Sequence, residues 1–164
     1  MLKHFKTFFY PVVLTYSYNQ PKELVIEKIT EVLKEKVTLF SSNDMTGEFL
    51  NQDTFTINTV SFAYTSGVKY GSTLVGQIIE SKNGMTEIRT KAKPSLALYS
   101  MFFIALIFGL LYLYKFFQTG STGFLFWSLA VLLLGTALSI WFSNVAIYSV
   151  RVRYNMYIDK ALIT

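Results

Sequence analysis

The spacing of hydrophobic and polar positions divides the chain into two unlike parts. In residues 1–93, charged and apolar residues alternate every few positions, as in an ordinary soluble domain. Residues 95–150 contain a single charged residue, Lys115. This break predicts a soluble, membrane-proximal domain at 1–93, a transmembrane hairpin at 94–148 and a cytoplasmic tail at 149–164.

The clearest helical pattern runs from Pro21 to Lys36. Proline is favoured at the first position of a helix, and an acidic residue is stabilising in the first turn. The apolar residues of this segment fall on one arc of a helical wheel: Leu24, Val25, Ile29, Val32 and Leu33. An acidic stripe lies opposite and indicates a solvated face: Glu23, Glu27, Glu31 and Glu35.

Strand patterns precede and follow this helix. Phe5 to Tyr18 reads as an extended segment that is broken or bulged near Pro11. Alternation over 54–59 predicts a half-buried strand that pairs with 48–50, and strands at 73–80 and 85–92 flank the turn signal Asn-Gly. The predicted fold is α+β: a small antiparallel sheet with one amphipathic helix on one face, followed by a two-helix transmembrane hairpin.

Two apolar segments are long enough to cross a bilayer. The first covers about 95–114, and twenty residues at ~1.5 Å each span the ~30 Å hydrocarbon core. The second covers about 124–148 and is longer than needed, so it tilts or projects beyond the bilayer. Residues 115–123 form the predicted polar turn. The tail at 149–164 fits a helical extension or a strand. The helical extension is our prediction, and its apolar residues are then available to pack on the soluble domain and lock it to the hairpin.

The net charge of +5 is concentrated around the apolar segments. Residues 1–88 hold eight lysines and nine acidic residues, so the domain is about neutral and a nucleic-acid partner is not expected. Seven basic residues flank the spans on the side of the termini: Lys82, Arg89, Lys91, Lys93, Arg151, Arg153 and Lys160. Because the connecting loop has only Lys115, both termini are predicted to be cytoplasmic in a two-span protein of the cell membrane. Five of these residues are candidate contacts to the membrane surface: Arg89, Lys91, Lys93, Arg151 and Arg153.

Small residues recur at multiples of four in both apolar segments. They are candidates for helix–helix packing: Ala97, Ala105 and Gly109 in the first, and Gly135, Ser139 and Ser143 in the second. Packing within the hairpin is one interpretation. Packing between copies, or against another membrane protein, is the other.

Candidate chemistry is sparse. The chain has no cysteine and one histidine, His4, so disulfides, thiolate metal sites and His-rich metal sites are excluded. No phosphate-binding loop pattern is present. The run Ser41–Asp44 is typical of a loop, and the predicted hairpin places Glu80 opposite Glu87 on a solvated surface. No catalytic residue, metal site or cofactor is predicted, and the protein is not expected to be an enzyme.

Three functional hypotheses remain open at this stage. The first is a non-enzymatic interaction module or accessory subunit, anchored by the hairpin among membrane lipids and docked on a membrane protein or on a second copy. The second is a module that binds a lipid or small hydrophobe in a cavity between sheet and helix. The third is an enzyme with a carboxylate or hydroxyl centre. The many aromatic residues of the domain fit a filled core as well as a cavity.

Overall fold

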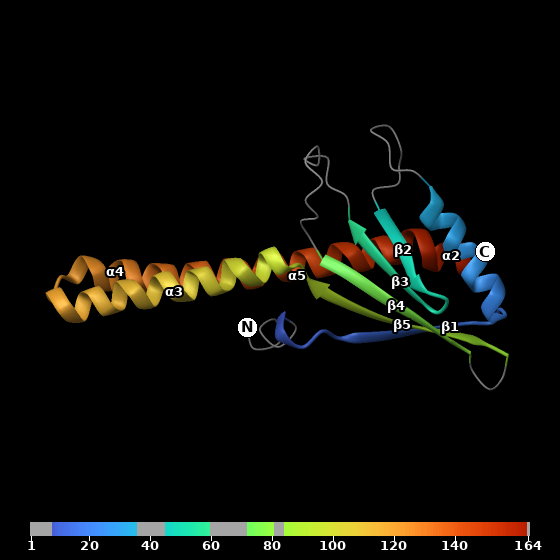
Figure 1. Cartoon of the computed structure of the whole chain (residues 1–164), viewed down its shortest axis with the longest axis horizontal. Helices are drawn as coiled ribbons and strands as arrows, with labels where there is room; N and C mark the ends of the chain where they lie inside the picture. Colours follow the sequence, from blue (N-terminus) through green and yellow to red (C-terminus); the bar gives the residue numbers. More distant parts are fainter. Residues whose placement is uncertain (1–7, 36–44, 60–71, 81–83, 164) are drawn as a thin grey trace.

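The computed structural model describes residues 8–35, 45–59, 72–80 and 84–163. It is elongated, with an antiparallel sheet at one end and a long helical hairpin at the other (Figure 1). The described strands are β1 Val13–Tyr18, β2 Met45–Asn51, β3 Thr54–Thr59, β4 Ser72–Glu80 and β5 Thr86–Pro94. They form one sheet in the order β1-β5-β4-β3-β2, and every neighbouring pair is antiparallel. The predicted α+β class is confirmed.

The strands that the alternating patterns predicted are present. β4 and β5 pair over nine positions, from Ser72 opposite Pro94 to Glu80 opposite Thr86. Gly84 has a φ of 72°, which favours glycine, and residues 81–85 separate the paired ends Glu80 and Thr86, so the connection is longer than a two-residue Asn-Gly turn. The segment before the first helix is shorter than predicted as a strand, because β1 begins only after Pro11. Proline supplies no N–H to a ladder, which accounts for this late start.

Helix α2 spans Lys22–Lys34 and covers part of one face of the sheet. Pro21 is the cap residue and not the first helical residue, because its ψ of 152° is extended while its carbonyl accepts from the Val25 N–H at 3.2 Å. Val25 and Ile29 are fully buried. The acidic stripe (Glu23, Glu27, Glu31 and Glu35) is exposed.

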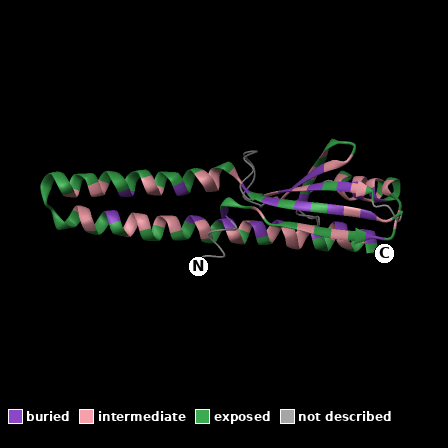
Figure 2. Ribbon diagram, turned by 90° about the horizontal axis from the view of Figure 1, so that it is seen from below, coloured by how far each residue is buried: buried purple, intermediate pink, exposed green. Residues whose placement is uncertain are grey.

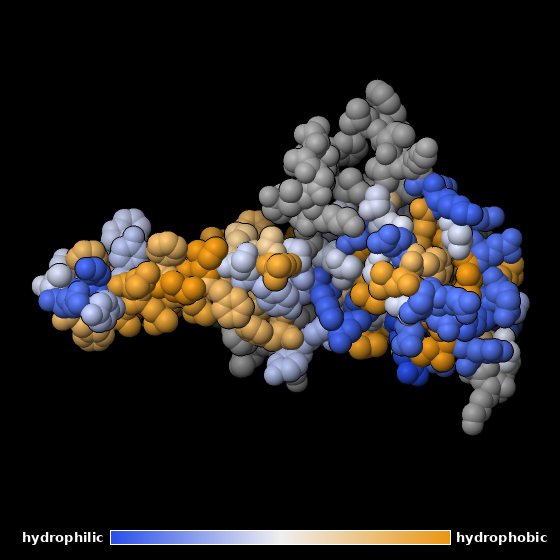
Figure 3. Space-filling view, in the orientation of Figure 1, coloured by the Kyte–Doolittle hydropathy of each residue, from blue (hydrophilic) through white to orange (hydrophobic). Residues whose placement is uncertain are grey.

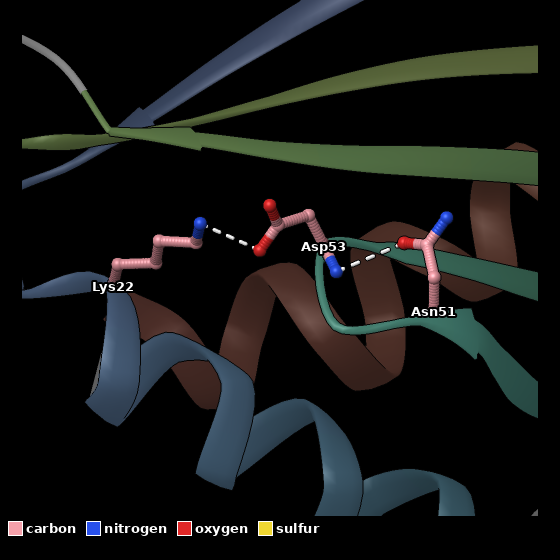
Figure 4. A network of polar contacts seen from close by, with 3 residues as sticks. All are labelled: Lys22, Asn51 and Asp53. Atoms are coloured by element: carbon pink, nitrogen blue, oxygen red, sulfur yellow. Dashed lines mark hydrogen bonds and ion pairs between the residues drawn. The ribbon is translucent and has the colours of Figure 1, made fainter.

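The start of α2 is joined to the β2–β3 turn by polar contacts (Figure 4). Lys22 Nζ lies 2.5 Å from Asp53 Oδ1, and the Asp53 N–H donates to Asn51 Oδ1 at 3.0 Å. The second contact closes a local turn that fixes the chain between the strands. Because the ion pair is partly exposed, it orients the helix more than it stabilises the fold.

Helix α3 spans Leu96–Thr119 and follows β5 with only Ser95 between them. It is longer than the predicted span of 95–114, and residues 115–119 are helical where the sequence suggested a turn. No glycine or proline interrupts them. The helix ends at Gly120, whose φ of 68° is the left-handed conformation that favours glycine, and its N–H donates to the Phe116 carbonyl at 2.8 Å.

A second helix runs from Thr122 to Ile163 without a break, over 42 residues. Its consecutive segments are α4 Thr122–Ala130, the π-helical η1 Val131–Gly135, α5 Thr136–Arg153, the π-helical η2 Tyr154–Asp159 and α6 Lys160–Ile163. The tail at 149–163 is therefore helical, as predicted, and it has no strand. In Figure 1 this red segment passes behind the sheet to the far end of the domain.

The sheet and the end of this long helix share one core. Buried apolar residues of the helix recur at intervals of three and four: Ile147, Val150, Tyr154, Ile158 and Leu162. They pack with the inward residues of the strands, among them Phe55, Ile57, Leu74, Ile78 and Ile88. The predicted fold has one amphipathic helix on the sheet and a helical tail available to pack on the domain, and in the structure α2 and the C-terminal half of the long helix cover the sheet together.

The two ends of the molecule differ sharply in surface. Buried residues gather in the domain, while the hairpin is exposed along most of its length (Figure 2). The exposed side chains along the hairpin are mostly apolar, and strongly hydrophilic ones gather at its tip (Figure 3). Among the described residues, Leu96–Thr119 and Thr122–Ile163 are each long and apolar enough to cross a membrane.

Candidate functional site

Three of the small residues predicted for helix packing lie where the two helices of the hairpin meet. Gly109 of α3 is buried, its carbonyl accepts from Ser128 Oγ at 2.8 Å, and a Cβ at this position would overlap Leu132. A Cβ on Gly135 would lie 2.8 Å from the Cβ of Ala105. The hairpin thus packs through close backbone approach, together with a hydrogen bond between its helices.

The other three small residues lie nearer the domain. Ser139 and Ser143 are buried, and their hydroxyls donate at 2.8 Å to the carbonyls of Gly135 and Ser139 within their own helix. Their polarity is therefore satisfied locally. Ala97 is half-buried in the first turn of α3.

Replacing Gly109 with leucine is expected to destabilise the hairpin by about 1–3 kcal/mol, because the new side chain overlaps Leu132 and weakens the Ser128 bond. The measurement is the thermal unfolding midpoint in mild detergent. The matched control is Gly123→Leu, since a Cβ on Gly123 has no neighbour closer than 3.7 Å. Equal effects of the two variants would contradict this packing.

The candidate membrane-surface residues do not form a ring around the base of the hairpin. Arg89, Lys91 and Lys93 alternate along β5 on the sheet face away from the helices, and all three are exposed. Successive members of this basic row lie about 7 Å apart along the strand, with Lys93 nearest α3. Only the near end of the row is thus close to the start of the hairpin.

The two arginines of the long helix have partners. Arg151 Nη2 donates to the Val12 carbonyl at 2.9 Å, just before β1. Arg153 Nη1 donates to the Ser149 carbonyl at 3.3 Å, one turn earlier in the helix. Arg151 therefore ties the N-terminal segment to the helix, and contact of either arginine with lipid stays a prediction.

Sequence reasoning missed a cluster of hydroxyl groups between β1 and the long helix. Tyr18 Oη donates to Asp159 Oδ1 at 2.7 Å and lies 3.2 Å from Tyr154 Oη. Because the one Tyr18 proton is directed at the carboxylate, Tyr154 donates to Tyr18. The ring of Tyr16 contacts that of Tyr154 in a tilted arrangement, with 4.8 Å between ring centroids, and its hydroxyl donates to Asn155 Oδ1 at 3.1 Å. We call these five residues the tyrosine cluster.

The residues of the tyrosine cluster come from one strand and one helical segment. Tyr16 and Tyr18 are two residues apart on a strand, so both point to the helix side of the sheet. Tyr154, Asn155 and Asp159 all belong to η2, whose wider turn brings Tyr154 and Asp159 to one strand residue. The available signal was the apolar period that continues through Ile147, Val150 and Tyr154, which the composition break obscured.

The phenols of the tyrosine cluster act as hydrogen-bond donors. Burial raises the pKa of Tyr18 and of Tyr154 well above the usual value, and the neighbouring hydroxyls and the Asp159 carboxylate raise the pKa of Tyr18 further. Burial also raises the pKa of Tyr16. All three phenols therefore stay protonated at neutral pH and hold the helix against β1.

Folding stability is expected to be level up to about pH 10 and to fall above it. The unfolded tyrosines ionise near 10.0, while the folded pKa values of Tyr18 and Tyr154 are higher. Their contribution is thus complete below pH 10 and is lost as the pH rises towards the folded values. Chemical denaturation between pH 7 and pH 11 measures this. Tyr18→Phe should flatten the fall, whereas an unchanged slope would show that the cluster is not its source.

Further polar contacts join the chain next to β1 to the end of the long helix, on the side away from the hairpin. Gln20 Nε2 donates to the Leu162 carbonyl at 2.9 Å, and Thr86 Oγ1 donates to the Gln20 carbonyl at 2.7 Å. With Arg151 and the tyrosine cluster, they fasten the whole length of β1 and its flanks to the C-terminal helix. The helix is thereby fixed in position along the sheet as well as packed against it.

Among the described residues, no group of three or more His, Asp or Glu side chains is close enough to hold a metal ion. Glu80 pairs with Thr86, and Glu87 with Ile79, so the expected opposition of Glu80 and Glu87 is wrong. The predicted loop at Ser41–Asp44 and His4 lie outside the described residues.

Comparison with protein-family models, with curated proteins and with solved structures finds no match to this chain, so a functional conclusion has to come from its geometry.

Proposed function

We propose that this protein is a non-enzymatic interaction module whose helical hairpin is embedded in a membrane and whose sheet domain stands at the membrane surface. The apolar side chains exposed along both helices of the hairpin support the membrane part of this proposal. In water such an apolar surface would favour aggregation, whereas in a bilayer the helices have to expose apolar side chains to the lipid.

The observation that carries the proposal is that hairpin and domain share one helix. Gly135 lies against Ala105, so nine residues further along each antiparallel helix Asn144 is level with Leu96, the start of α3. The part before Asn144 is ~34 Å long and matches a bilayer core, and the part after it is ~28 Å long and lies on the sheet. The only other connection is Ser95, directly after β5.

This construction holds the domain in a fixed orientation to the hairpin. Neither connection contains a flexible linker, and the tyrosine cluster prevents the helix from sliding along β1. A rigid mount presents one defined surface of the domain to other proteins at the membrane. It is less suited to a domain that searches for partners on a tether.

Aromatic residues at the level of Leu96 fit the border between bilayer and water. The Phe8 ring lies 4.9 Å from that of Tyr99 and 5.2 Å from that of Phe102, and Tyr99 Oη donates to the Phe8 carbonyl at 3.0 Å. Aromatic residues with a polar end are enriched at this depth. The excess of basic residues on this side places both termini and the domain in the cytoplasm in our proposal.

The core between sheet and helices favours this function over hydrophobe binding. A bound lipid or small hydrophobe would need an apolar cavity there. The largest fully buried side chains of the domain include Tyr154, Phe55 and Met45, and they occupy that layer. These buried aromatic side chains are therefore part of the packed core.

The proposal is tested by isolating the tagged full chain from membranes in mild detergent and identifying what accompanies it. The first step is extraction of membranes with alkaline carbonate, in which an embedded protein stays with the lipid. A membrane protein at a fixed ratio to the chain supports the module. Release by carbonate, or a lone chain that carries one defined lipid or metabolite, would overturn the proposal.

A further inference from the structure

The strand β1 leaves one edge of the sheet open. It lies at the end of the strand order, and its only strand partner among the described residues is β5 (Figure 1). Thr90 Oγ1 donates to the Leu14 carbonyl at 3.3 Å, which places the backbone polar groups of Leu14 on the β5 side. Because these groups alternate along a strand, those of Val13, Thr15 and Ser17 point to the open edge.

This edge lacks the features by which proteins usually protect a free strand. Residues Val13–Tyr18 contain no lysine, no proline and no bulge, and their register with β5 is continuous over six positions. Val13 is 54 % exposed, and Thr15 and Ser17 are exposed beside it. By contrast, β2 at the opposite edge has a register shift between Phe49 and Asn51. An additional strand would therefore pair best with β1.

The charge next to this edge indicates what the additional strand should carry. On the face away from the helices, Lys91 is the partner of Val13, and Arg89 is the partner of Thr15. Val13 and Thr15 are short, so they leave room for these long basic side chains to reach over them to a strand at the edge. A strand added to β1 would lie about 10 Å from β5, within reach of a glutamate that faces the same side.

The far end of the edge has the opposite charge. Ser17 is the partner of Glu87, and Glu87 lies 3.6 Å from Arg89. An acidic residue placed beside Ser17 would face a carboxylate at close range, which is unfavourable. The edge therefore favours acidic residues next to Val13 and Thr15 and a neutral or basic one next to Ser17.

We propose that β1 is a docking edge for an extended acidic segment of a partner protein, which adds to the sheet as a further strand and sets its alternate carboxylates against Lys91 and Arg89. This inference rests on the proposed function, since it names the surface and the partner chemistry of the same module. Backbone hydrogen bonds would supply affinity, and the basic row would supply selectivity.

A second copy of the chain fits this edge poorly. The strand Val13–Tyr18 has no acidic residue to face Lys91 and Arg89 in another copy. Moreover, β1 runs along the long axis of the molecule, so antiparallel pairing of two β1 strands would place their hairpins at opposite ends (Figure 1). Two copies in one bilayer have their hairpins on the same side.

The test uses the full chain in lipid nanodiscs and a fluorescent seven-residue peptide. On the face towards the basic row the peptide carries two glutamates, for the positions beside Val13 and Thr15, and a threonine for the position beside Ser17; its other residues are Val or Thr. We expect saturable binding that Lys91→Glu weakens about tenfold. Lys34→Glu, which makes the same charge change on the exposed end of α2, should leave it unchanged. Equal loss with both variants would reduce the effect to net charge and overturn the proposal.

Backbone pairing is tested separately from charge. Thr15→Pro removes an N–H that points to the open edge and leaves the ladder to β5 in place, so it should abolish binding while the unfolding midpoint is retained. If that variant does not fold, peptides methylated on alternate backbone nitrogens replace it. Methylation of the backbone nitrogens that face β1 should prevent binding, and methylation of those that face away from β1 should not. Equal binding of both peptides would contradict strand addition.

Other outcomes separate this inference from the proposed function. Dimerisation that Lys91→Glu abolishes would name a second copy as the occupant and overturn the acidic partner. Binding of the basic row to vesicles with anionic lipid, without peptide binding, would overturn it in favour of the membrane. If a membrane protein stays bound at a fixed ratio to the Thr15→Pro variant, the proposed function is supported and only the docking edge is contradicted.

Discussion

A chain that ends at Ser149 is expected to lose the folded sheet domain, although every strand is still present. The deletion removes the buried side chains Val150, Tyr154, Ile158 and Leu162, which cover the inner face of the sheet. Full burial of such residues contributes about 1.5–3 kcal/mol each, or about 6–12 kcal/mol for four. That sum equals the whole stability of a typical domain, about 5–15 kcal/mol.

Resistance to a protease in mild detergent measures this loss, because an unfolded sheet is cut at many sites while the hairpin stays protected. Two single substitutions in the same helix serve as matched variants. Ile158→Ala, at a fully buried position, should cost about 2–5 kcal/mol, whereas Met156→Ala, at an exposed one, should be close to neutral. A truncated chain as resistant as the full one would show that the sheet is stable without the helix.

Substitution of Gly76 in β4 is expected to destabilise the sheet strongly. Phe55 and Gly76 are direct partners across β3 and β4, and the Phe55 ring lies over the glycine, so a Cβ there would overlap the ring. Phe55 is fully buried and has Phe49 at 5.8 Å, which leaves it little room to move. Gly76→Val should therefore cost about 3 kcal/mol, and Phe55→Ala about 3–5 kcal/mol.

A double-mutant cycle identifies the ring as the cause. Shortening Phe55 to leucine should make Gly76→Ala less costly than it is in the unaltered chain, because the overlapping atoms are gone. Denaturant unfolding gives the four free energies. Gln77→Val, on the exposed face of the same strand, is the control and should change little. Additive effects of the two substitutions would contradict the packing of Phe55 on Gly76.

The sequence was sufficient for those parts of the fold that local chemistry specifies. The alternation through Phe55 and Ile57 predicted β3, and Asn83-Gly84 predicted the turn between β4 and β5. The apolar arc of α2 predicted its two fully buried residues, Val25 and Ile29. In each case the pattern extends over neighbouring residues, so no distant contact was needed to recognise it.

Contacts between distant parts of the chain were not predictable in the same way. Tyr18 and Asp159 are 141 positions apart, and nothing near either residue indicates the other. The composition break near Tyr148 marks a change in what surrounds the long helix, not the end of the helix. The tail was predicted as a helix available to pack on the domain, but the break obscured the apolar period that continues to Leu162 and with it the residues that complete the core.

In the candidate site, too, local patterns were predictable from the sequence and contacts between distant residues were not. The small-residue stripes could be read locally, and Ala105, Gly109 and Gly135 do lie at the contact between the helices. The basic residues were also apparent, but only the register of β5 against β1 places Lys91 and Arg89 beside an open edge. Strand order depends on pairings across the whole sheet, which a one-dimensional pattern does not contain.

The central claim is that one helix passes from the bilayer into the core of the domain, and spin labels at two of its exposed positions test it most directly. The chain has no cysteine, so Leu134→Cys and Met156→Cys each give one labelling site, at residues that are 64 % and 61 % exposed. In proteoliposomes we expect the label at 134 to collide with oxygen and be shielded from a water-soluble nickel relaxant, and the label at 156 to show the reverse. Equal access of the nickel relaxant to both labels would contradict the account.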